Sequence, residues 1–157
     1  MKTLSRIILI ITALISLNAC THNNGDIGHL FGTWKLNEIT ANGELDSVYA
    51  EADNVLWKFQ SSVMSMIRAN DVTHSRFESW ASWEYTDNET RIALNFTNTD
   101  DNNTNPGASI YSPLPEMHMP KACIVYVDII TLSHKEMVLR YTSEDGVEYI
   151  YRFKRWA

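Results

Sequence analysis

From Phe31 onward, apolar and polar residues alternate with a period of two, and this alternation constrains the fold more than any other feature. Trp34 and Leu36 share one face, whereas Thr33 and Lys35 share the other. Successive side chains of a β-strand point to opposite faces of the sheet, so the pattern predicts strands with one apolar face. No stretch of helical length carries an apolar stripe at helical spacing, and residues 45–54 form at most a short helix.

The alternation recurs in eight segments that we expect to be strands: 32–39, 55–60, 62–68, 74–86, 91–97, 124–133, 137–141 and 147–154. Turn-forming residues separate several of them, including Asp87-Asn88 and Asp145-Gly146. Eight sequentially connected strands with one apolar face predict an all-β fold. The expected architecture is an eight-stranded antiparallel up-and-down barrel, because closure removes the sheet edges that an open meander would expose.

The first 19 residues predict a lipoprotein signal peptide. Lys2 and Arg6 precede an apolar core at residues 7–17, which as a helix would span about 16 Å, too little to cross a bilayer. Leu17-Asn18-Ala19-Cys20 resembles a bacterial lipobox, in which the cysteine is acylated and becomes the first mature residue. We therefore expect lipidation of Cys20 and attachment to a membrane through this N-terminal lipid anchor. The alternative is a soluble secreted protein with an unmodified cysteine.

The predicted organisation is a signal peptide at 1–19, a lipidated tether at 20–29 and a barrel domain at 30–157. In such lipoproteins an Asp directly after the lipidated cysteine resembles a signal for retention in the inner membrane. Here the residue after Cys20 is Thr21 and not Asp. We therefore expect the outer membrane, with the protein facing the periplasm rather than the cell surface. Acylation of Cys20 would leave Cys123 without a disulfide partner in the chain.

The predicted mature chain is acidic. The whole sequence has 13 basic and 19 acidic residues, for a formal charge of −6. The signal peptide holds two of the basic residues and none of the acidic ones, so its removal leaves a charge of −8. Such a surface repels phosphate backbones, so we expect no nucleic-acid partner.

The sequence Gly32-Thr33-Trp34 after a polar linker resembles the Gly-x-Trp opening of lipocalin and lipocalin-like barrels. Together with the lipobox and the closing segment 145–155, it resembles the lipocalin-like domain lipoproteins of Bacteroidetes. The resemblance implies that Trp34 closes one end of the barrel and that a basic residue of the last strand packs over its ring. Arg152 and Arg155 both match by position, and we take Arg152 as the barrel-closing partner.

Aromatic residues dominate the faces expected to point inward. An eight-stranded barrel is just wide enough to be filled by side chains or to hold one small ligand, so a packed core and an apolar pocket both remain open. The inward set is Trp34, Trp57, Phe59, Phe77, Trp83, Tyr85, Phe96, Tyr141, Tyr149, Tyr151 and Phe153. The candidate pocket residues are Trp34, Trp57, Trp83, Phe96, Tyr141 and Tyr151. Trp80 falls on the polar face, where it is either incidental or a contact for a partner.

Residues 98–122 form a connection long enough to be a lid or a binding loop. Asp101, Asn103 and Asn105 have the alternate spacing of calcium ligands, but Pro106 stands where a calcium loop has glycine, which favours a solvated turn.

Four soft ligands follow in the same connection: Met117, His118, Met119 and Cys123. They form a weak candidate for a Cu(I) site. The competing interpretation is that the thiol is a small buried apolar group and that the methionines cover hydrophobic surface. We otherwise expect no metal and no cofactor.

Catalytic motifs are missing from the sequence, which has no Gly-x-Ser-x-Gly, no His-Glu-x-x-His and no phosphate-binding glycine loop. Asp128 lies in a very apolar strand and is a candidate inward carboxylate, either paired with Arg140 or Arg152 or orienting a ligand.

The leading interpretation is a non-enzymatic, lipid-anchored module of the cell envelope that binds a small apolar or amphipathic molecule. The alternative is a structural or protein-interaction lipoprotein with a filled barrel, which contacts another envelope protein.

Overall fold

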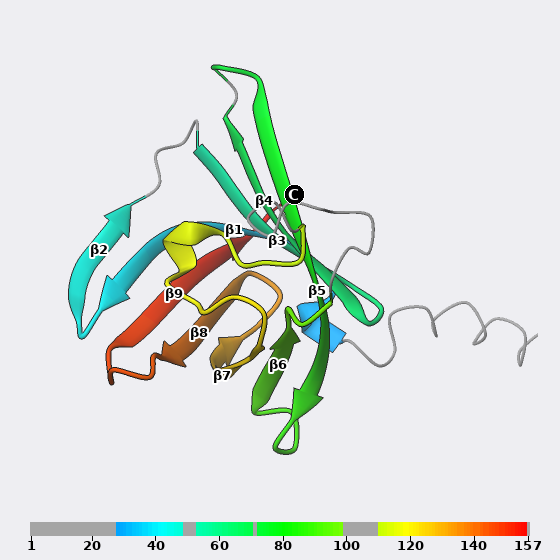
Figure 1. Cartoon of the computed structure of the whole chain (residues 1–157), viewed down its shortest axis with the longest axis vertical. Coiled ribbons are helices and arrows are strands. Elements are labelled where there is room, and N and C mark those ends of the chain that lie inside the picture. The colour runs from blue at the N-terminus through cyan, green and yellow to red at the C-terminus, as the bar shows by residue number, and fades with distance from the viewer. Residues whose placement is uncertain (1–27, 49–52, 71, 99–109, 157) are drawn as a thin grey trace, which may run out of the picture.

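The computed structural model describes residues 28–48, 53–70, 72–98 and 110–156 (Figure 1). The predicted signal peptide, Cys20, most of the tether and the calcium-like stretch lie outside the described residues. The elements are η2 (Gly28–Leu30), β1 (Gly32–Ala41), β2 (Glu44–Val48), β3 (Asp53–Gln60), β4 (Val63–Asn70), β5 (Ser75–Thr86), β6 (Arg91–Asn95), η3 (Pro115–Met117), β7 (Ile124–Leu132), β8 (Glu136–Thr142) and β9 (Glu148–Arg155). Within the described residues, no helix has the length and apolar character needed to cross a membrane.

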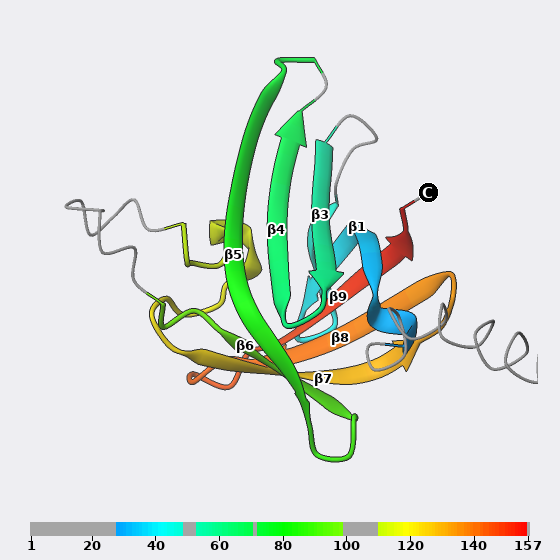
Figure 2. The same cartoon turned by 90° about the vertical axis from the view of Figure 1, so that its right-hand side faces the viewer.

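The strands form a closed antiparallel barrel. They are hydrogen-bonded in the order β2-β1-β3-β4-β5-β6-β7-β8-β9, and β1 also pairs with β9. That last pairing closes the sheet, so β1 and β3 to β9 make an eight-stranded barrel from which β2 extends (Figures 1 and 2). The eight predicted strands correspond to these eight, and the predicted eight-stranded antiparallel up-and-down barrel is confirmed.

The strand β2 was not predicted, and the expectation of at most a short helix at 45–54 is wrong for its first part. Asn42 and Gly43 have φ angles of 50° and 84°, as the two central residues of a primed hairpin turn require. The turn pairs β2 with residues 38–41 of β1, whereas residues 32–35 of β1 pair with β3.

The hydrophobic core is the lumen of the barrel. Directly paired residues of antiparallel strands place their side chains on the same face of the sheet. Trp34 pairs with Trp57, Trp57 with Met66 and Met66 with Ser79, so this row of side chains faces inward across β1, β3, β4 and β5. Phe77 was also expected in the core; it lies on the inward face of β5 as predicted, but near the start of the strand it is 50% exposed and not buried.

Candidate ligand-binding site in the barrel lumen

One end of the barrel, which we call the closed end, is sealed around Trp34. The indole Nε1 of Trp34 donates a hydrogen bond to the carbonyl oxygen of Leu30 (2.9 Å), and both residues are fully buried. The guanidinium of Arg155 lies over the indole ring, 4.8 Å from the ring centroid, and donates to the carbonyl oxygen of His29 (3.1 Å). Arg155, and not Arg152, is therefore the partner of Trp34. Arg152 is an exposed residue whose Nε contacts Glu38 Oε1 at 2.9 Å.

The structure explains why the first residue of the Gly-x-Trp motif is glycine. Gly32 has a φ of 116°, a conformation that side chains other than glycine rarely adopt. A Cβ atom at this position would lie 2.7 Å from Nη2 of Arg155. The motif therefore provides both the backbone conformation and the space that let Arg155 reach the Trp34 ring.

An aromatic cluster occupies the lumen above the closed end. The ring of Trp57 lies 5.0 Å from Phe153, 6.0 Å from Tyr151 and 6.3 Å from Phe59, measured between ring centroids. Phe59 in turn makes an edge contact with Trp83 at 5.4 Å. Edge and tilted contacts at these separations are the favoured arrangements of aromatic pairs. The cluster joins β3, β5 and β9 across the barrel.

Three polar atoms in this apolar interior have no hydrogen-bond partner among the described residues. They are Nε1 of Trp57, Nε1 of Trp83 and Oγ of Ser79, whose residues are 0%, 7% and 0% exposed. Buried donors and acceptors are normally paired, and leaving one unpaired costs about 1–3 kcal/mol. These three atoms are therefore polar groups in the lumen whose hydrogen-bonding capacity is unused by the described residues.

Flexible side chains contribute heavily to the same interior. The sequence has six methionines, and the five that fall in the described residues all belong to the core cluster. They are Met64, Met66, Met117, Met119 and Met137. Methionine has an unbranched, polarizable side chain that adapts its shape to its neighbours. A lumen lined in this way can rearrange around a small molecule more easily than one built from branched side chains.

The end of the barrel opposite the closed end, which we call the mouth, is covered by residues 110–123, the mouth segment. Leu114 and Met117 from this segment are fully buried and belong to the same core cluster as the barrel interior. Tyr151 of β9 donates a buried hydrogen bond from its hydroxyl to the carbonyl oxygen of Met117 (2.5 Å). Figure 2 shows η3 and η2 on opposite sides of the barrel. The mouth segment therefore closes the lumen with inserted side chains.

Polar contacts fasten the mouth segment at its surface. Glu116 accepts a hydrogen bond from Arg68 Nε (2.7 Å) and forms an ion pair with the same guanidinium. Nε2 of His118 lies 3.1 Å from Oδ2 of Asp46 in β2, and its ring stacks on Tyr149 with centroids 4.6 Å apart. The unpredicted β2 thus supplies one of the contacts that hold the segment.

The four candidate copper ligands make separate contacts. Met117 and Met119 are buried in the core cluster, whereas His118 is bound to Asp46. Cys123 has Sγ 3.7 Å from the carbonyl oxygen of Pro120, and burial, with a contribution from Glu144, raises the pKa of its thiol. A raised thiol pKa opposes the thiolate form that binds metals. Among the described residues, no three His, Cys, Asp or Glu side chains are grouped so as to hold a metal ion.

The six candidate pocket residues all lie in the core cluster and are at most 7% exposed: Trp34, Trp57, Trp83, Phe96, Tyr141 and Tyr151. Trp34 belongs to the seal of the closed end.

Burial raises the pKa of Tyr141, and it raises the pKa of Tyr85 to about 12. Sequence reasoning missed Ser79 and Leu114.

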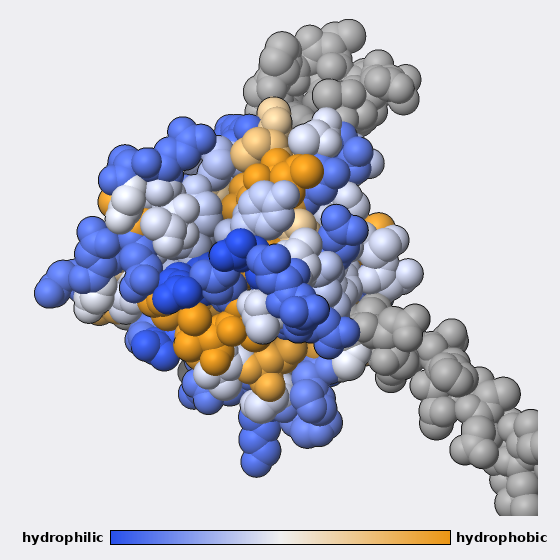
Figure 3. Space-filling view, turned by 90° about the horizontal axis from the view of Figure 1, so that it is seen from below, coloured by the Kyte–Doolittle hydropathy of each residue, from blue (hydrophilic) through white to orange (hydrophobic). Residues whose placement is uncertain are grey.

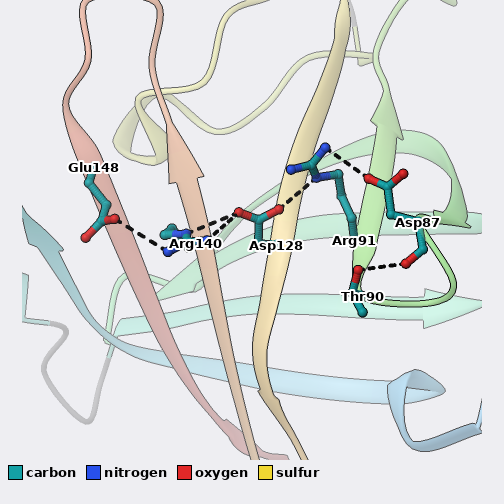
Figure 4. A network of polar contacts seen from close by, with 6 residues as sticks. All are labelled: Asp87, Thr90, Arg91, Asp128, Arg140 and Glu148. Atoms are coloured by element: carbon teal, nitrogen blue, oxygen red, sulfur yellow. Dashed lines mark hydrogen bonds and ion pairs between the residues drawn. The ribbon is translucent and has the colours of Figure 1, made fainter.

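Asp128 points outward, so of the two roles left open for it, pairing with an arginine is found and orienting a ligand in the lumen is not. Val127 beside it faces the lumen, and Asp128 belongs to a network of charges on the outer face of β6 to β9 (Figure 4). Its carboxylate contacts Arg91 Nε at 2.7 Å and Arg140 Nη2 at 2.9 Å. Desolvation raises the pKa of Asp128, but its hydrogen bonds and charge interactions with the two arginines outweigh this and hold the pKa below its usual value. Of the two expected partners, Arg140 pairs with Asp128 and Arg152 pairs with Glu38 instead, and Arg91 is an additional partner.

The outer surface of the barrel also carries apolar residues. Ile124, Tyr126 and Ile130 on β7 are about half exposed. Trp80 is partly covered and lines a shallow groove with Ile110 and other residues. Seen from below, the surface shows hydrophobic areas on both sides of a hydrophilic band (Figure 3). Trp80 is therefore part of a larger apolar area and not an isolated exposed ring.

Comparisons with known proteins agree with this architecture. Residues 13–153 match the family described as a lipocalin-like domain. Among solved structures, a lipocalin-like protein from Bacteroides uniformis aligns with a TM-score of 0.55 at 14% identity, over 82% of this chain and 100% of that one. A deswapped triple mutant of bovine odorant-binding protein aligns with a TM-score of 0.42 at 9% identity, over 82% and 75% of the two chains. No curated protein sequence matches the chain. Because the family match extends over most of its length, the chain belongs to the lipocalin-like domain family.

Proposed function

We propose that this protein is a lipid-anchored, non-catalytic module of the bacterial cell envelope that binds a small apolar or amphipathic molecule in its barrel lumen. The observation that carries the proposal is how the mouth is closed. Leu114 and Met117 fill the mouth from a separate segment, which a few surface contacts and the Tyr151 hydrogen bond fasten. Such a closure can open without disrupting the strand pairing of the barrel.

The chemistry of the lumen supports the same proposal. Ligand sites are mostly apolar and contain a few polar groups that orient the ligand. The interior combines five methionines, a cluster of aromatic rings and the unpaired polar atoms of Trp57, Ser79 and Trp83. Lipocalin barrels of eight strands are wide enough to hold one small ligand in the lumen.

A fluorescent apolar probe tests this proposal directly. We expect N-phenyl-1-naphthylamine to bind at a single saturable site and to quench the emission of Trp57 by energy transfer. Trp57→Phe should change the dissociation constant of the probe, because Trp57 faces the lumen, whereas Trp80→Phe, on the outer face, should leave it unchanged. Organic extraction of the purified protein followed by mass spectrometry should also release a bound small molecule. If the probe does not enter and nothing is extracted, the binding function is wrong.

Anchoring through Cys20 is the second part of the proposal. It rests on the lipobox-like sequence Leu17-Asn18-Ala19-Cys20. The first described residues, Gly28–Leu30, sit at the closed end, where the carbonyl oxygens of His29 and Leu30 accept hydrogen bonds from Arg155 and Trp34. An anchor on the preceding residues would therefore hold the closed end toward the membrane and leave the mouth accessible from the aqueous side.

Metabolic labelling tests the anchor. Cells that express the protein with radioactive palmitate should incorporate the label, and Cys20→Ser should abolish the incorporation. Cys123→Ser is the matched control, because we expect it to keep the label. We further expect the labelled protein in the outer-membrane fraction, protected from protease in intact cells. Labelling that survives Cys20→Ser would contradict the anchor.

A protein-interaction role is the second candidate, and the apolar outer surface favours it. Ile124 and Tyr126 lie side by side on the outer face of β7, next to a groove that is also lined by Ala93. Under this alternative, Tyr126→Asp abolishes capture of an envelope protein by crosslinking, and no apolar probe enters the lumen. Retained probe binding by Tyr126→Asp would support the lumen function instead.

A further inference from the structure

We propose that the ligand of the lumen presents a neutral hydrogen-bond acceptor to the indole N–H groups of Trp57 and Trp83 and to the hydroxyl of Ser79. This inference rests on the proposed function, because it assigns the chemistry recognised by the same site. It goes beyond a general preference for apolar molecules by naming the group that the ligand must carry.

These three groups are buried, so leaving them without a hydrogen bond is energetically costly. Trp57 and Ser79 are 0% exposed and Trp83 is 7% exposed, and within the part of the chain that the structure describes no atom accepts a hydrogen bond from either indole. A serine hydroxyl can turn toward its own backbone, but an indole N–H is fixed by its ring and can only donate. The two indoles therefore require an acceptor from a ligand, and the hydroxyl can add a third contact.

The register places the groups along one part of the barrel wall. Met66 of β4 pairs with Trp57 of β3 on one side and with Ser79 of β5 on the other. Trp83 lies on the same inward face of β5 as Ser79, and its ring touches Phe59, which also contacts Trp57. A small molecule that displaces the flexible Met66 side chain would meet Trp57 and Ser79 together, whereas Trp83 lies farther along the same wall, beyond Phe59.

Because these protein groups donate hydrogen bonds, the ligand must supply an acceptor. The charged residues around the lumen indicate that this acceptor is neutral. The two inward-facing arginines of the described strands lie near opposite ends of the barrel and are already engaged. Arg68 pairs with Glu116 near the mouth, and Arg155 covers Trp34 at the closed end. An ionised carboxylate placed between them would be buried without a counter-charge, which is costly. A ketone, an ester or an amide oxygen meets the same donors without that cost.

Two other buried hydroxyls lack a partner, but they do not belong to this site. Ser65 lies between Met64 and Met66 in β4, and Thr86 follows Tyr85 in β5, so strand alternation turns both outward. They cannot contact the same ligand atom as Trp57.

Three naphthalenes of nearly equal shape test the proposal: 2-acetonaphthone, 2-ethylnaphthalene and 2-naphthoate. Each is titrated against the purified protein in competition with N-phenyl-1-naphthylamine. We expect the ketone to bind about tenfold more tightly than the ethyl compound, as one or two good hydrogen bonds allow, and the carboxylate to bind no better than the ethyl compound. Trp57→Phe and Ser79→Ala should each reduce the preference for the ketone, while Trp80→Phe should preserve it.

The outcomes separate this inference from the function on which it rests. Equal affinity for the ketone and the ethyl compound overturns the inference and leaves the lumen function standing. Tighter binding of the naphthoate than of the ketone also overturns it, because the acceptor would then be charged. If neither the three compounds nor N-phenyl-1-naphthylamine binds, the proposed function fails as well. Ser79→Ala removes only a hydroxyl, so it keeps the test valid if Trp57→Phe does not fold.

Discussion

The hydroxyl of Tyr151 donates a buried hydrogen bond to the carbonyl oxygen of Met117, with the two oxygens 2.5 Å apart. This bond joins the last barrel strand to the segment that covers the mouth. Met117 itself is fully buried in the core cluster. The closure of the lumen therefore depends on a buried hydrogen bond between elements that are 34 residues apart in sequence.

Tyr151→Phe should loosen the mouth segment without unfolding the barrel. The change removes the donor and leaves the Met117 carbonyl unpaired, at a cost of about 1–3 kcal/mol. We expect faster hydrogen exchange of amides in residues 114–119 and faster association of an apolar probe. Tyr126→Phe, which removes a hydroxyl from an exposed tyrosine, is the control. Unchanged exchange in the Tyr151 variant would show that this bond does not hold the mouth closed.

Gly32→Ala should destabilise the whole domain. Alanine at a φ of 116° is strained, and its Cβ would lie 2.7 Å from Nη2 of Arg155. We expect a loss of more than about 1 kcal/mol in the free energy of unfolding, measured in urea. Gly43→Ala is the matched control, because Gly43 also has a positive φ but has no atom within 4 Å of its added Cβ. Equal losses in the two variants would mean that the contact with Arg155 is unimportant.

Arg155→Met should lower stability more than Arg152→Met. Arg155 lies over the Trp34 ring and bonds the carbonyl of His29, contacts expected to contribute about 0.5–1 kcal/mol each. Arg152 pairs with Glu38 on the surface, where such ion pairs contribute about 0–1 kcal/mol. Thermal unfolding of both variants checks this order, and a larger loss for Arg152→Met would restore the assignment made from sequence.

Asp128→Asn should remove stability at neutral pH but not in acid. The arginines hold the pKa of Asp128 in the folded protein below its usual value. Its contribution is therefore present above the unfolded pKa of about 3.9 and is lost as the pH falls through the folded pKa. We expect a difference of about 1 kcal/mol from the wild type at pH 7, reduced by salt because the side chain is 27% exposed. A difference in the free energy of unfolding that grows as the pH falls would contradict a lowered pKa for Asp128 in the folded protein.

The alternation of residues predicted the barrel because it assigns each side chain to a face. It does not report height along the barrel, so Phe77 was assigned to the inward face correctly but lies exposed near the strand end. The same parity could have identified Arg155, which shares the inward face with Tyr151 and Phe153, instead of Arg152. The Asn42-Gly43 turn was a readable signal for β2, but the polar sequence after it hid the strand.

The mouth segment could not have been predicted in the same way. Leu114 and Met117 have no period of two, and their burial depends on where the chain crosses the barrel end. The partners of His118 are 72 residues away at Asp46 and in the last strand at Tyr149. The sequence marked residues 98–122 as an unusual connection, while only the tertiary structure shows which of its side chains enter the lumen.

Methyl NMR of the methionines tests the central claim, ligand binding in the lumen, most directly. All five methionines of the described residues lie in the core cluster, so each of their labelled methyl groups reports on the interior. Titration of the carbon-13-labelled protein with N-phenyl-1-naphthylamine should shift the signals of Met64, Met66 and Met117 with one common saturation curve. Saturable probe binding that leaves all of these signals unmoved would place the probe on the outer surface and contradict a binding site in the lumen.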